Sequence, residues 1–340
     1  MSFFKLQIAA LIVPLGFYSS INSCTTIEKE TVTTEPSLKT YLVGDSSNVE
    51  TKTKGGFLLM GGSKDVEVAI KWFLERSGGG DVVVIRSSGA DGYNKFMFDL
   101  HKVNSVETLM LDSRDKSYLP EVAKKIRNAE ALFIAGGDQW NYVKYWKDSP
   151  VEDALNYLIN EKKVPIGGTS AGLAILGEFY FDARNDTVTS LEALENPYNE
   201  NVTIGKSDFI NCKFLANTIT DSHYTQRSRQ GRHIVFLARM AKDFGLKNAR
   251  GIGVDEQTAV CIDENGIGKV YGINDAYFLD SDGSKPDKCQ IGEKLSWNTV
   301  KAYKISGSLE GNGRFEAKTW KLDGGTAYSY SVTDGKLTEK

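Results

Sequence analysis

Residues 164–176 read Val164-Pro-Ile-Gly-Gly-Thr-Ser170-Ala-Gly-Leu-Ala-Ile-Leu176. A short apolar run ends in two glycines, a lone serine follows, and small and apolar residues then continue at helical spacing. The pattern predicts a strand, a tight turn and a helix, with Ser170 at the turn. Gly168 and Gly172 lie two positions on either side of it, as in the G-x-S-x-G nucleophile elbow. Because the pattern is short, a turn without chemistry fits it about equally well.

Backbone N–H groups near Ser170 are candidates for stabilising a negative charge. A helix that begins at Ala171 directs its unpaired N–H groups toward the serine oxygen. A second glycine turn, Gly136-Gly137-Asp138-Gln139, follows the apolar run 131–134. Consecutive strand–turn–helix units with right-handed crossovers place their turns at one edge of a sheet, so we expect Gly137 and Gln139 near Ser170. The alternative for Asp138 and Gln139 is a helix cap beside a solvated side chain.

Apolar runs alternate with helical patterns through the first half of the chain. This alternation predicts strands covered on both faces, and hence an α/β fold with a mainly parallel sheet between two helical layers. The predicted strands are 56–60, 81–85, 106–111, 131–134 and 164–168, and the predicted helices are 66–74, 93–101, 121–128, 139–146 and 152–160. Residues 178–208 are polar and interrupted, which indicates an irregular excursion. After Gly266, short strands with Gly, Asp and Asn turns predict a β-rich C-terminal elaboration.

The N-terminal residues have the features of an export signal. Lys5 precedes the largely apolar run 6–17, which is too short to span a bilayer, and Ser20-Ile-Asn-Ser-Cys24 resembles a bacterial lipoprotein signal. We expect 1–23 to be a cleaved signal peptide, Cys24 to be lipidated, and 24–52 to be a flexible tether to the membrane. A plain secretory signal with an incidental cysteine is the alternative. Either interpretation places the protein in the periplasm or at the cell surface.

Composition excludes several classes of function. The chain has 41 basic and 44 acidic residues, a net charge of −3, so nothing indicates a nucleic-acid partner. After Cys24 only Cys212, Cys261 and Cys289 remain, so one disulfide at most can form. The three histidines show no H-E-x-x-H or cysteine-pair spacing, and we expect no metal and no cofactor. The oligomeric state is left open, a homodimer included.

A nucleophilic serine needs a base and, behind it, an acid. His223 follows the strand-like run 214–219, whereas His101 and His233 lie in predicted helices, so His223 is the better candidate. Asp255 and Glu256 interrupt the apolar run 251–261, which is costly unless they are paired. Alternation along a strand places the two acids on opposite faces, so only one of them can orient the histidine.

Three arginines follow the candidate base. Arg229 and Arg232 share a helical face, and guanidinium groups bind carboxylates in a bidentate manner. For Arg229 and Arg232, an anionic substrate and an internal acidic side chain are equally good partners. For Arg227 we favour the substrate.

Four motifs in order resemble the cyanophycinase family of serine peptidases, which is related to the α-aspartyl dipeptidases. They are Gly-Gly-Asp-Gln139, Gly-Gly-Thr-Ser170-Ala-Gly, Asp221-Ser-His223-x-x-Gln-Arg-x-Arg-x-x-Arg232 and Gly-Val-Asp-Glu256-x-Thr-Ala, and the resemblance covers roughly 57–280. It implies a fold like that of class I glutamine amidotransferases and a triad of Ser170, His223 and Glu256. It also implies substrate-pocket positions, which are Gln139, Asp221, Arg227, Arg229 and Arg232. At Ser222 the family commonly has glutamine.

The resemblance implies an exported serine peptidase that acts on aspartyl-linked peptides. Cyanophycin, a poly-aspartate with arginine side groups, is the first choice of substrate, with β-Asp-Arg dipeptides as products. The alternatives are an aspartyl dipeptidase or isopeptidase acting on short peptides, and a surface lipoprotein that binds peptides without catalysis. We expect a peptidase domain over 53–282 and a β-rich extension over 283–340.

Overall fold

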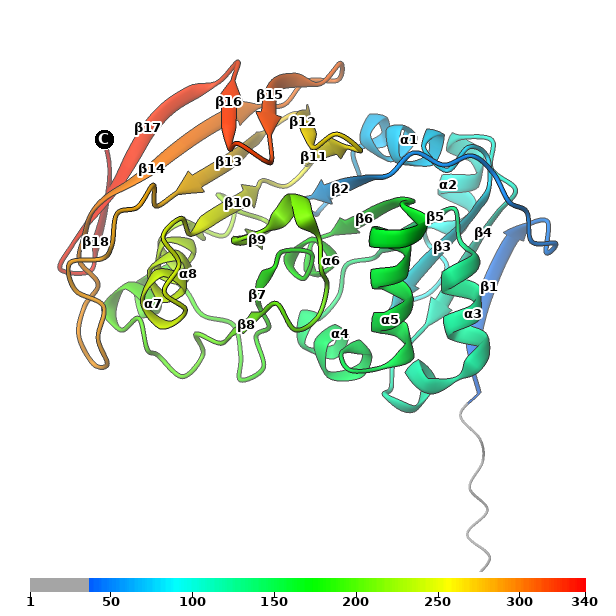
Figure 1. Cartoon of the computed structure of the whole chain (residues 1–340), viewed down its shortest axis with the longest axis horizontal. Helices are drawn as coiled ribbons and strands as arrows, with labels where there is room; N and C mark the ends of the chain where they lie inside the picture. Colours follow the sequence, from blue (N-terminus) through cyan, green and yellow to red (C-terminus); the bar gives the residue numbers. More distant parts are fainter. Residues whose placement is uncertain (1–36) are drawn as a thin grey trace, which may run out of the picture. The chain divides into compact units, whose positions relative to one another are not determined.

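Two β-sheets organise residues 37–340, the part of the chain that this computed structural model describes. The predicted signal peptide and the lipidated Cys24 lie outside the described residues. In spatial order the first sheet contains β1 (Lys39–Gly44), β4 (Ser105–Met110), β3 (Asp81–Arg86), β5 (Ala131–Ile134), β6 (Pro165–Thr169), β2 (Gly56–Met60), β11 (Thr258–Asp263), β12 (Ile267–Gly272), β15 (Asn312–Glu316) and β16 (Lys321–Asp323) (Figure 1). The second contains β18 (Lys336–Glu339), β17 (Thr326–Thr333), β14 (Trp297–Ser306), β13 (Asp275–Asp280), β10 (Arg250–Val254), β9 (Thr218–Asp221), β7 (Phe179–Phe181) and β8 (Ile204–Lys206).

Parallel pairing is confined to the centre of each sheet. Strands β4, β3, β5, β6 and β2 run parallel in the first sheet, and β7, β9 and β10 in the second. The remaining pairs are antiparallel, including every pair made by the C-terminal strands. The predicted α/β fold with a β-rich C-terminal elaboration is confirmed, although the parallel strands are divided between two sheets. The specific likeness to glutamine amidotransferases stays a prediction.

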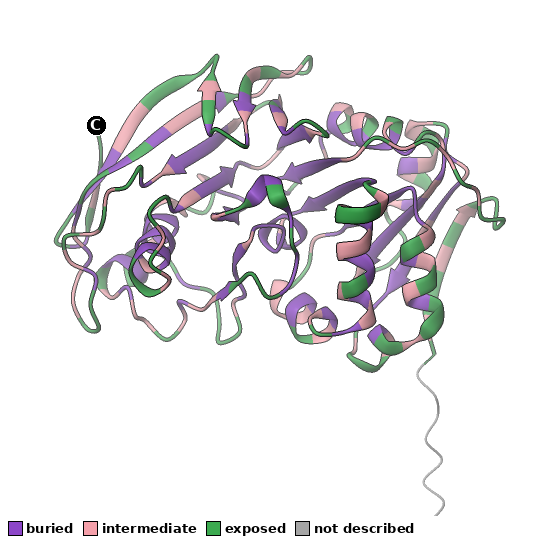
Figure 2. Ribbon diagram, viewed as in Figure 1, coloured by how far each residue is buried: buried purple, intermediate pink, exposed green. Residues whose placement is uncertain are grey.

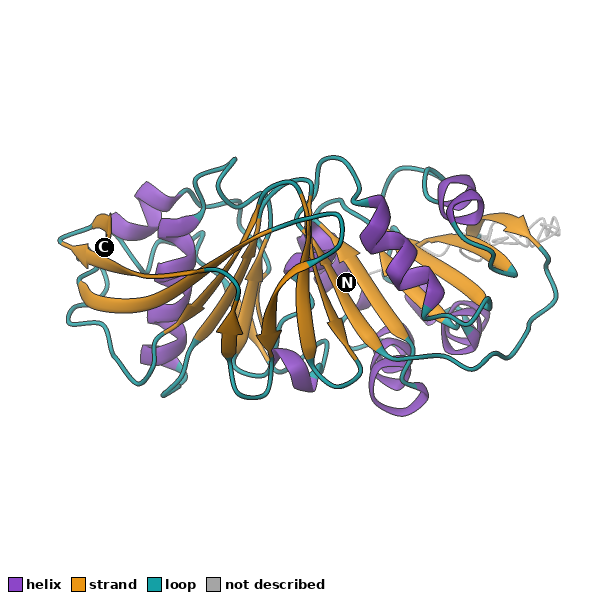
Figure 3. Cartoon of the chain, turned by 90° about the horizontal axis from the view of Figure 1, so that it is seen from above, coloured by secondary structure: helices purple, strands orange, loops and turns teal. Residues whose placement is uncertain are grey.

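Helices cover both faces of the parallel part of the first sheet (Figure 3). On one face, α1 (Glu67–Glu75) and α2 (Asn94–Leu100) pack on alternate strand residues such as Leu58, Val84 and Phe133. On the other, α3 (Pro120–Asn128), α4 (Gln139–Trp146) and α5 (Pro150–Tyr157) pack on Leu59, Ile85 and Ile134. Successive strand residues point to opposite faces, so fully apolar strands are buried on both sides (Figure 2). This is the predicted three-layer arrangement.

The other helices are shorter or belong to the second sheet. Helix α6 (Ala171–Ala174) follows β6 directly, α7 (Ser190–Glu195) lies in the segment after β7, and α8 (Gln230–Asp243) packs its apolar face under β9 and β10. Short 3₁₀ turns cover Asp115–Tyr118 and Lys213–Leu215, and a π turn, Leu158–Lys162, extends α5. None of the helices between residues 37 and 340 is both long and apolar enough to span a membrane.

The predicted tether is wrong over its second half. Residues 39–44 form β1, which pairs antiparallel with β4, and the Val49 N–H donates to an Asp81 carboxylate oxygen at 3.0 Å. Tyr41 and Val43 alternate with exposed residues, so the stretch can cover the edge of the sheet although its polar composition resembles a linker. A flexible tether therefore has to end before Lys39.

Two further expectations need correction. The segment 178–208 is not irregular throughout, because it contains β7, α7 and β8, and α7 begins with a capping box between Thr189 and Glu192. Run 251–261 is not one strand. Its first part, β10, belongs to the second sheet and its last part, β11, to the first, with the turn 255–257 between them.

The C-terminal residues 283–340 extend both sheets and form no separate body. Strand β14 pairs with β13, while β15 pairs with β12. Phe315 and Trp320 join the core of the first sheet, and Trp297 that of the second. Residues 37–340 form one compact unit. The extension expected from residue 283 is part of this unit, and the position of its boundary at 282 stays a prediction.

Candidate active site

Ser170 lies at the apex of a tight turn between β6 and α6. Its backbone has φ 53° and ψ −116°, outside the ordinary regions for a residue with a side chain. The turn is this tight because the flanking glycines allow backbone to touch backbone. A Cβ at Gly168 would lie 2.5 Å from the Gly172 carbonyl oxygen, and one at Gly172 would lie 2.2 Å from that of Ile134. The predicted helix after the serine is only four residues long.

His223 and Glu256 come from the second sheet. The parallel neighbours β9 and β10 end at Asp221 and Val254, and the second residue after each end carries the imidazole (His223) and the carboxylate (Glu256). The two sheets meet at the end of β2, where the Met60 carbonyl accepts from the Ser170 N–H at 3.0 Å and the Gly61 carbonyl accepts from the His223 N–H at 2.9 Å. The serine and the histidine are thereby fixed to consecutive residues of one strand end.

The three side chains form a continuous hydrogen-bond chain. Ser170 Oγ lies 2.8 Å from His223 Nε2, and His223 Nδ1 lies 2.6 Å from Glu256 Oε1. An ionised carboxylate only accepts, so Nδ1 carries the proton and Nε2 is free to accept the serine O–H. Asp255 is not the partner of the histidine. Its Oδ1 accepts from the backbone N–H and the hydroxyl of Thr225, at 2.8 and 2.7 Å.

Burial and two nearby arginines lower the pKa of His223. Burial lowers the pKa of His223, the positive charges of Arg227 and Arg229 lower it further, and Glu256 opposes both. The hydrogen bond from His223 lowers the pKa of Glu256 in turn. Both directions favour a neutral imidazole beside an ionised carboxylate near neutral pH, the state in which the imidazole can take a proton from serine.

Gly62 makes room for the imidazole. It has φ 107°, and a Cβ there would lie 2.5 Å from His223 Cε1. The sequence alone did not point to Gly61-Gly62-Ser63 as part of the site, since this turn lacks any phosphate-binding spacing. Its position directly after an apolar strand is the only signal that could have suggested a ligand edge.

Of the two expected oxyanion donors, Ala171 directly follows the serine and Gly137 belongs to the glycine turn after β5. A Cβ at Gly136 would contact Ser170 Cβ at 3.4 Å, so the glycine turn after β5 adjoins the nucleophile. Among residues 37–340, no acceptor is bonded to the backbone N–H of Ala171 or of Gly137. Gln139 begins α4, and its Nε2 donates to the Phe181 carbonyl at 2.6 Å. Its amide nitrogen is thus bound internally.

Asp221, Arg229 and Arg232 form a buried ion cluster. Arg232 donates to both oxygens of Asp221, from Nε at 2.8 Å and from Nη2 at 2.7 Å, and Arg229 Nη1 donates at 3.1 Å. Burial alone would raise the pKa of Asp221, but the two arginines outweigh it and hold the pKa at about 2. This geometry gives no support to the expectation that Asp221 and Arg232 contact substrate. For Arg229 and Arg232 it favours the alternative of an internal acidic side chain as the partner.

Arg227 differs from the other two arginines. It is exposed, it follows His223 on the same loop, and it forms no ion pair within the described part of the chain. Its charge reaches both His223 and Glu256. Of the three predicted arginines, it is the one positioned to meet an anion arriving from solvent.

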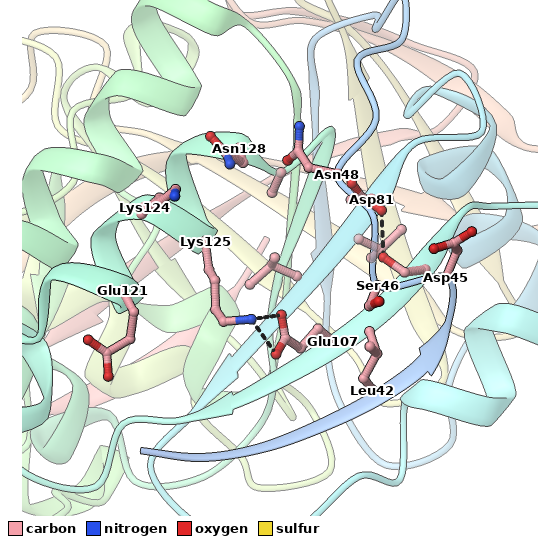
Figure 4. A pocket seen from close by; sticks show the side chains of 14 residues that line it. Leu42, Asp45, Ser46, Asn48, Asp81, Glu107, Glu121, Lys124, Lys125 and Asn128 are labelled. Carbon is pink, nitrogen blue, oxygen red and sulfur yellow. Dashed lines mark hydrogen bonds and ion pairs between the residues drawn. The ribbon is translucent and has the colours of Figure 1, made fainter. Parts of the chain in front are cut away.

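Elsewhere in the domain, a polar cavity and three cysteines offer further chemical groups. A cavity of about 380 Å³ is lined by residues of β1, β3, β4 and α3, at the amino ends of the parallel strands and therefore at the edge opposite Ser170 (Figure 4). There Lys125 binds both oxygens of Glu107 and Asp81 accepts from Ser105. Cys212, Cys261 and Cys289 are buried and unpaired, and no group of three potential metal ligands occurs within 37–340.

A serine hydroxyl bonded to an imidazole that is bonded to a carboxylate, at the rim of an α/β sheet, defines a hydrolase of the nucleophilic-serine class. Comparison with known proteins gives the family. The sequence model of Peptidase family S51 matches residues 57–270, more than half of the chain, so the chain belongs to this family and is a serine-type peptidase.

Curated relatives are similar over most of the chain. A cyanophycinase of Synechococcus elongatus is 24% identical, with 72% of this chain and 74% of the relative covered. A cyanophycinase of Trichormus variabilis is 23% identical, with 67% and 74% covered. Among solved structures, a peptidase from an acI-B1 Actinobacterium matches 67% of this chain and 91% of its own, at 15% identity and a TM-score of 0.48.

Proposed function

We propose that this peptidase hydrolyses aspartyl-linked peptides through an acyl-enzyme formed on Ser170. The hydrogen-bond chain from Ser170 through His223 to Glu256 is the observation that carries the proposal. In the first step Ser170 Oγ bonds to the substrate carbonyl carbon while its proton passes to His223 Nε2. The C–N bond then breaks as the imidazolium returns that proton to the leaving amine.

Water completes the cycle by the same proton route. It attacks the acyl carbon, gives its proton to His223 Nε2, and the ester bond to Ser170 breaks as the proton returns to the serine oxygen. Glu256 stabilises the imidazolium in both halves. The N–H groups of Ala171 and Gly137 are our candidates for the oxyanion hole, because Ala171 directly follows Ser170, Gly137 lies in the glycine turn that contacts Ser170 through Gly136, and neither N–H is bonded within the described residues.

Cyanophycin is the first choice of substrate. The family match and the relatives named cyanophycinase support it, and the exposed Arg227 supplies a cation for the free α-carboxylate of an arginine side group. Cleavage of cyanophycin would release β-Asp-Arg dipeptides. A second candidate, hydrolysis of short aspartyl peptides or isopeptides, is favoured by Ser222. This residue is buried against Arg229 where the resembled family commonly carries the longer glutamine.

Product identification tests the substrate directly. The purified protein would be incubated with cyanophycin, β-Asp-Arg and α-aspartyl dipeptides, with the Ser170→Ala variant as control, and the products identified by mass spectrometry. The first choice expects β-Asp-Arg from the polymer and none from the control. Cleavage of the dipeptides alone would move the assignment to the second candidate, and no cleavage of any of them would contradict both.

We also propose that the protein is exported and held to a membrane through Cys24. The support is the pattern of residues 1–24 alone. Expression in bacteria fed a labelled fatty acid tests this proposal. Label in the full-length chain, absent from the Cys24→Ala variant, is the expected result. An unlabelled chain in the cytoplasmic fraction would contradict export and anchoring together.

A further inference from the structure

The backbone of Glu256 is held on both sides by side-chain amides. Gln226 Oε1 accepts from the Glu256 N–H at 2.9 Å, and Asn274 Nδ2 donates to the Glu256 carbonyl at 2.8 Å. The Thr258 hydroxyl donates to the same carbonyl at 3.2 Å. These bonds fix the main chain of the acid while leaving its carboxylate free for His223.

Asn274 is itself held by the C-terminal elaboration. The Gly307 N–H donates to the Asn274 carbonyl at 2.8 Å, and the Gly272 N–H donates to the Ser308 carbonyl at 3.1 Å. The turn at 272–274 presses on the acid loop, since a Cβ at Gly272 would lie 2.2 Å from the Gln257 carbonyl oxygen. Residues 272–274, 307 and 308 all follow the segment 57–270 that matches the family.

We propose that Gln226 and Asn274 are positioning residues that hold the Glu256 carboxylate against His223, and that the C-terminal elaboration acts on the active site through Asn274. This inference rests on the triad of the proposed function. Glu256 is half-buried on a turn between two sheets, outside any strand or helix that would fix its position. The two side-chain amides anchor this turn with directional hydrogen bonds, and bonds of this kind from supporting residues hold catalytic groups in place.

The charges around His223 give the proposal a distinctive signature. Burial, Arg227 and Arg229 act to lower the pKa of His223, and Glu256 acts to raise it. Displacing the Glu256 carboxylate weakens the interaction that raises the pKa of His223 and leaves the charges of the two arginines in place. The acid limb of the kcat/KM profile should then move to lower pH while the rate falls, a combination that general loss of stability does not produce.

The experiment compares Asn274→Ala and Gln226→Ala with the matched control Asn312→Ala. Like Asn274, Asn312 donates its side-chain amide to a backbone carbonyl, that of Ser306, at 2.9 Å. This bond joins the two ends of the β14–β15 connection and does not involve Glu256. We expect kcat/KM to fall about tenfold in the two test variants, because sub-ångström displacement of a catalytic group is enough for such a loss. Their acid limbs should move to lower pH. Asn274→Gln should recover part of the rate, and Asn312→Ala should match the wild type.

Combining Asn274→Ala with Glu256→Gln tests the positioning role separately from the catalytic role of Glu256. In the Glu256→Gln variant, Asn274→Ala should cause no further loss, because the group that it positions is already gone. A full additional tenfold loss would overturn the positioning role, as would a wild-type rate and pH profile for both test variants while Glu256→Gln is impaired. Full activity of Glu256→Gln would overturn the triad, and this inference with it.

Discussion

Three residues at unusual backbone conformations build the catalytic corner. Ser170 and His223 have φ of 53° and 44°, and Gly62 has φ of 107°. For residues with a Cβ such conformations cost of order 1–3 kcal/mol each and persist where the surroundings impose them. Here the imposed contacts are the hydrogen bonds to Met60 and Gly61. The strain brings the hydroxyl and the imidazole to 2.8 Å.

Removing the charge of Arg227 should move the pH profile upward. Arg227 lowers the pKa of His223, so in Arg227→Ala the imidazole protonates at higher pH and the acid limb of kcat/KM shifts up. The matched control is Arg314→Ala, an exposed arginine on β15 that has no part in the pKa shift of His223. Rates measured between about pH 4 and 9 with a small aspartyl substrate check this around the ordinary histidine pKa. An acid limb that stays in place or moves down would contradict the electrostatic account.

Some residues of the site were predicted from the sequence and others were missed. Ser170 and His223 were predicted because the glycine pattern and the scarcity of histidines single them out. The choice between Asp255 and Glu256 could not be made by alternation along a strand, since the two acids lie on a turn between sheets. Gly62, Gln226 and Asn274 were missed because their roles depend on contacts between distant segments. For Gln226 the only available signal was its place in the Gln-Arg-x-Arg motif.

At the scale of elements, the Asp221 cluster joins the end of β9 to the first turn of α8. Replacing Asp221 by Asn leaves the buried guanidinium of Arg232 and the partly buried one of Arg229 with no counter-charge, and we expect a loss of about 3–5 kcal/mol in the free energy of unfolding. The control Asp243→Asn breaks a surface pair with Arg239 and should cost less than about 1 kcal/mol. Denaturant titration measures both. Unchanged stability together with a raised KM would instead support direct substrate contact by Asp221.

The same cluster predicts acid sensitivity. Asp221 has a folded pKa of about 2, below the ordinary carboxyl value of about 3.9, so the stability that it contributes is present above about pH 4 and is lost as pH falls toward 2. Burial lowers the pKa of neighbouring His233 to about 4. Because the unfolded histidine binds a proton near pH 6.5, the folded state loses stability between about pH 6.5 and 4 as well. In Asp221→Asn the loss of stability at the lower pH, between about pH 4 and 2, should disappear.

Elements with a complete apolar face were predicted within one or two residues. Strands β2, β3 and β5 follow the expected ranges because they are buried on both faces, and helices α1, α3 and α4 do so because each has one buried apolar face at helical spacing. Prediction from sequence failed for strands that form mainly because a neighbouring strand pairs with them. Strand β1 has a mostly exposed face, and β7 and β8 are three residues each, so their own residues carry too little pattern.

At the scale of the whole domain, the catalytic chain crosses from one sheet to the other. The serine follows a strand of the first sheet, the histidine follows a strand of the second, and the glutamate lies on the turn that joins the two, so activity requires that both sheets keep their relative positions. The sequence indicated parallel strands and a β-rich end but could not show two sheets. That division depends on long-range pairing, such as β2 with β11 across about two hundred residues of chain.

Truncation after Asp282 should therefore destroy the domain. It would strip β14 from β13 and β15 from β12, leaving two unpaired edges and removing the buried Trp297 and Phe315. Size-exclusion chromatography and thermal unfolding should show aggregated protein with no cooperative transition and no activity. A monomeric, cooperatively folding and active fragment would instead show that 283–340 is a dispensable extension.

The most direct test of the central claim, that Ser170 is a nucleophile activated by His223, is peptide mapping by mass spectrometry after treatment with a serine-directed phosphonate. The account predicts a single phosphonyl adduct on the peptide that contains Ser170, no adduct in Ser170→Ala, and much slower labelling in His223→Ala. An enzyme that hydrolyses its substrate while Ser170 stays unlabelled, or a Ser170→Ala variant with undiminished turnover, would contradict it.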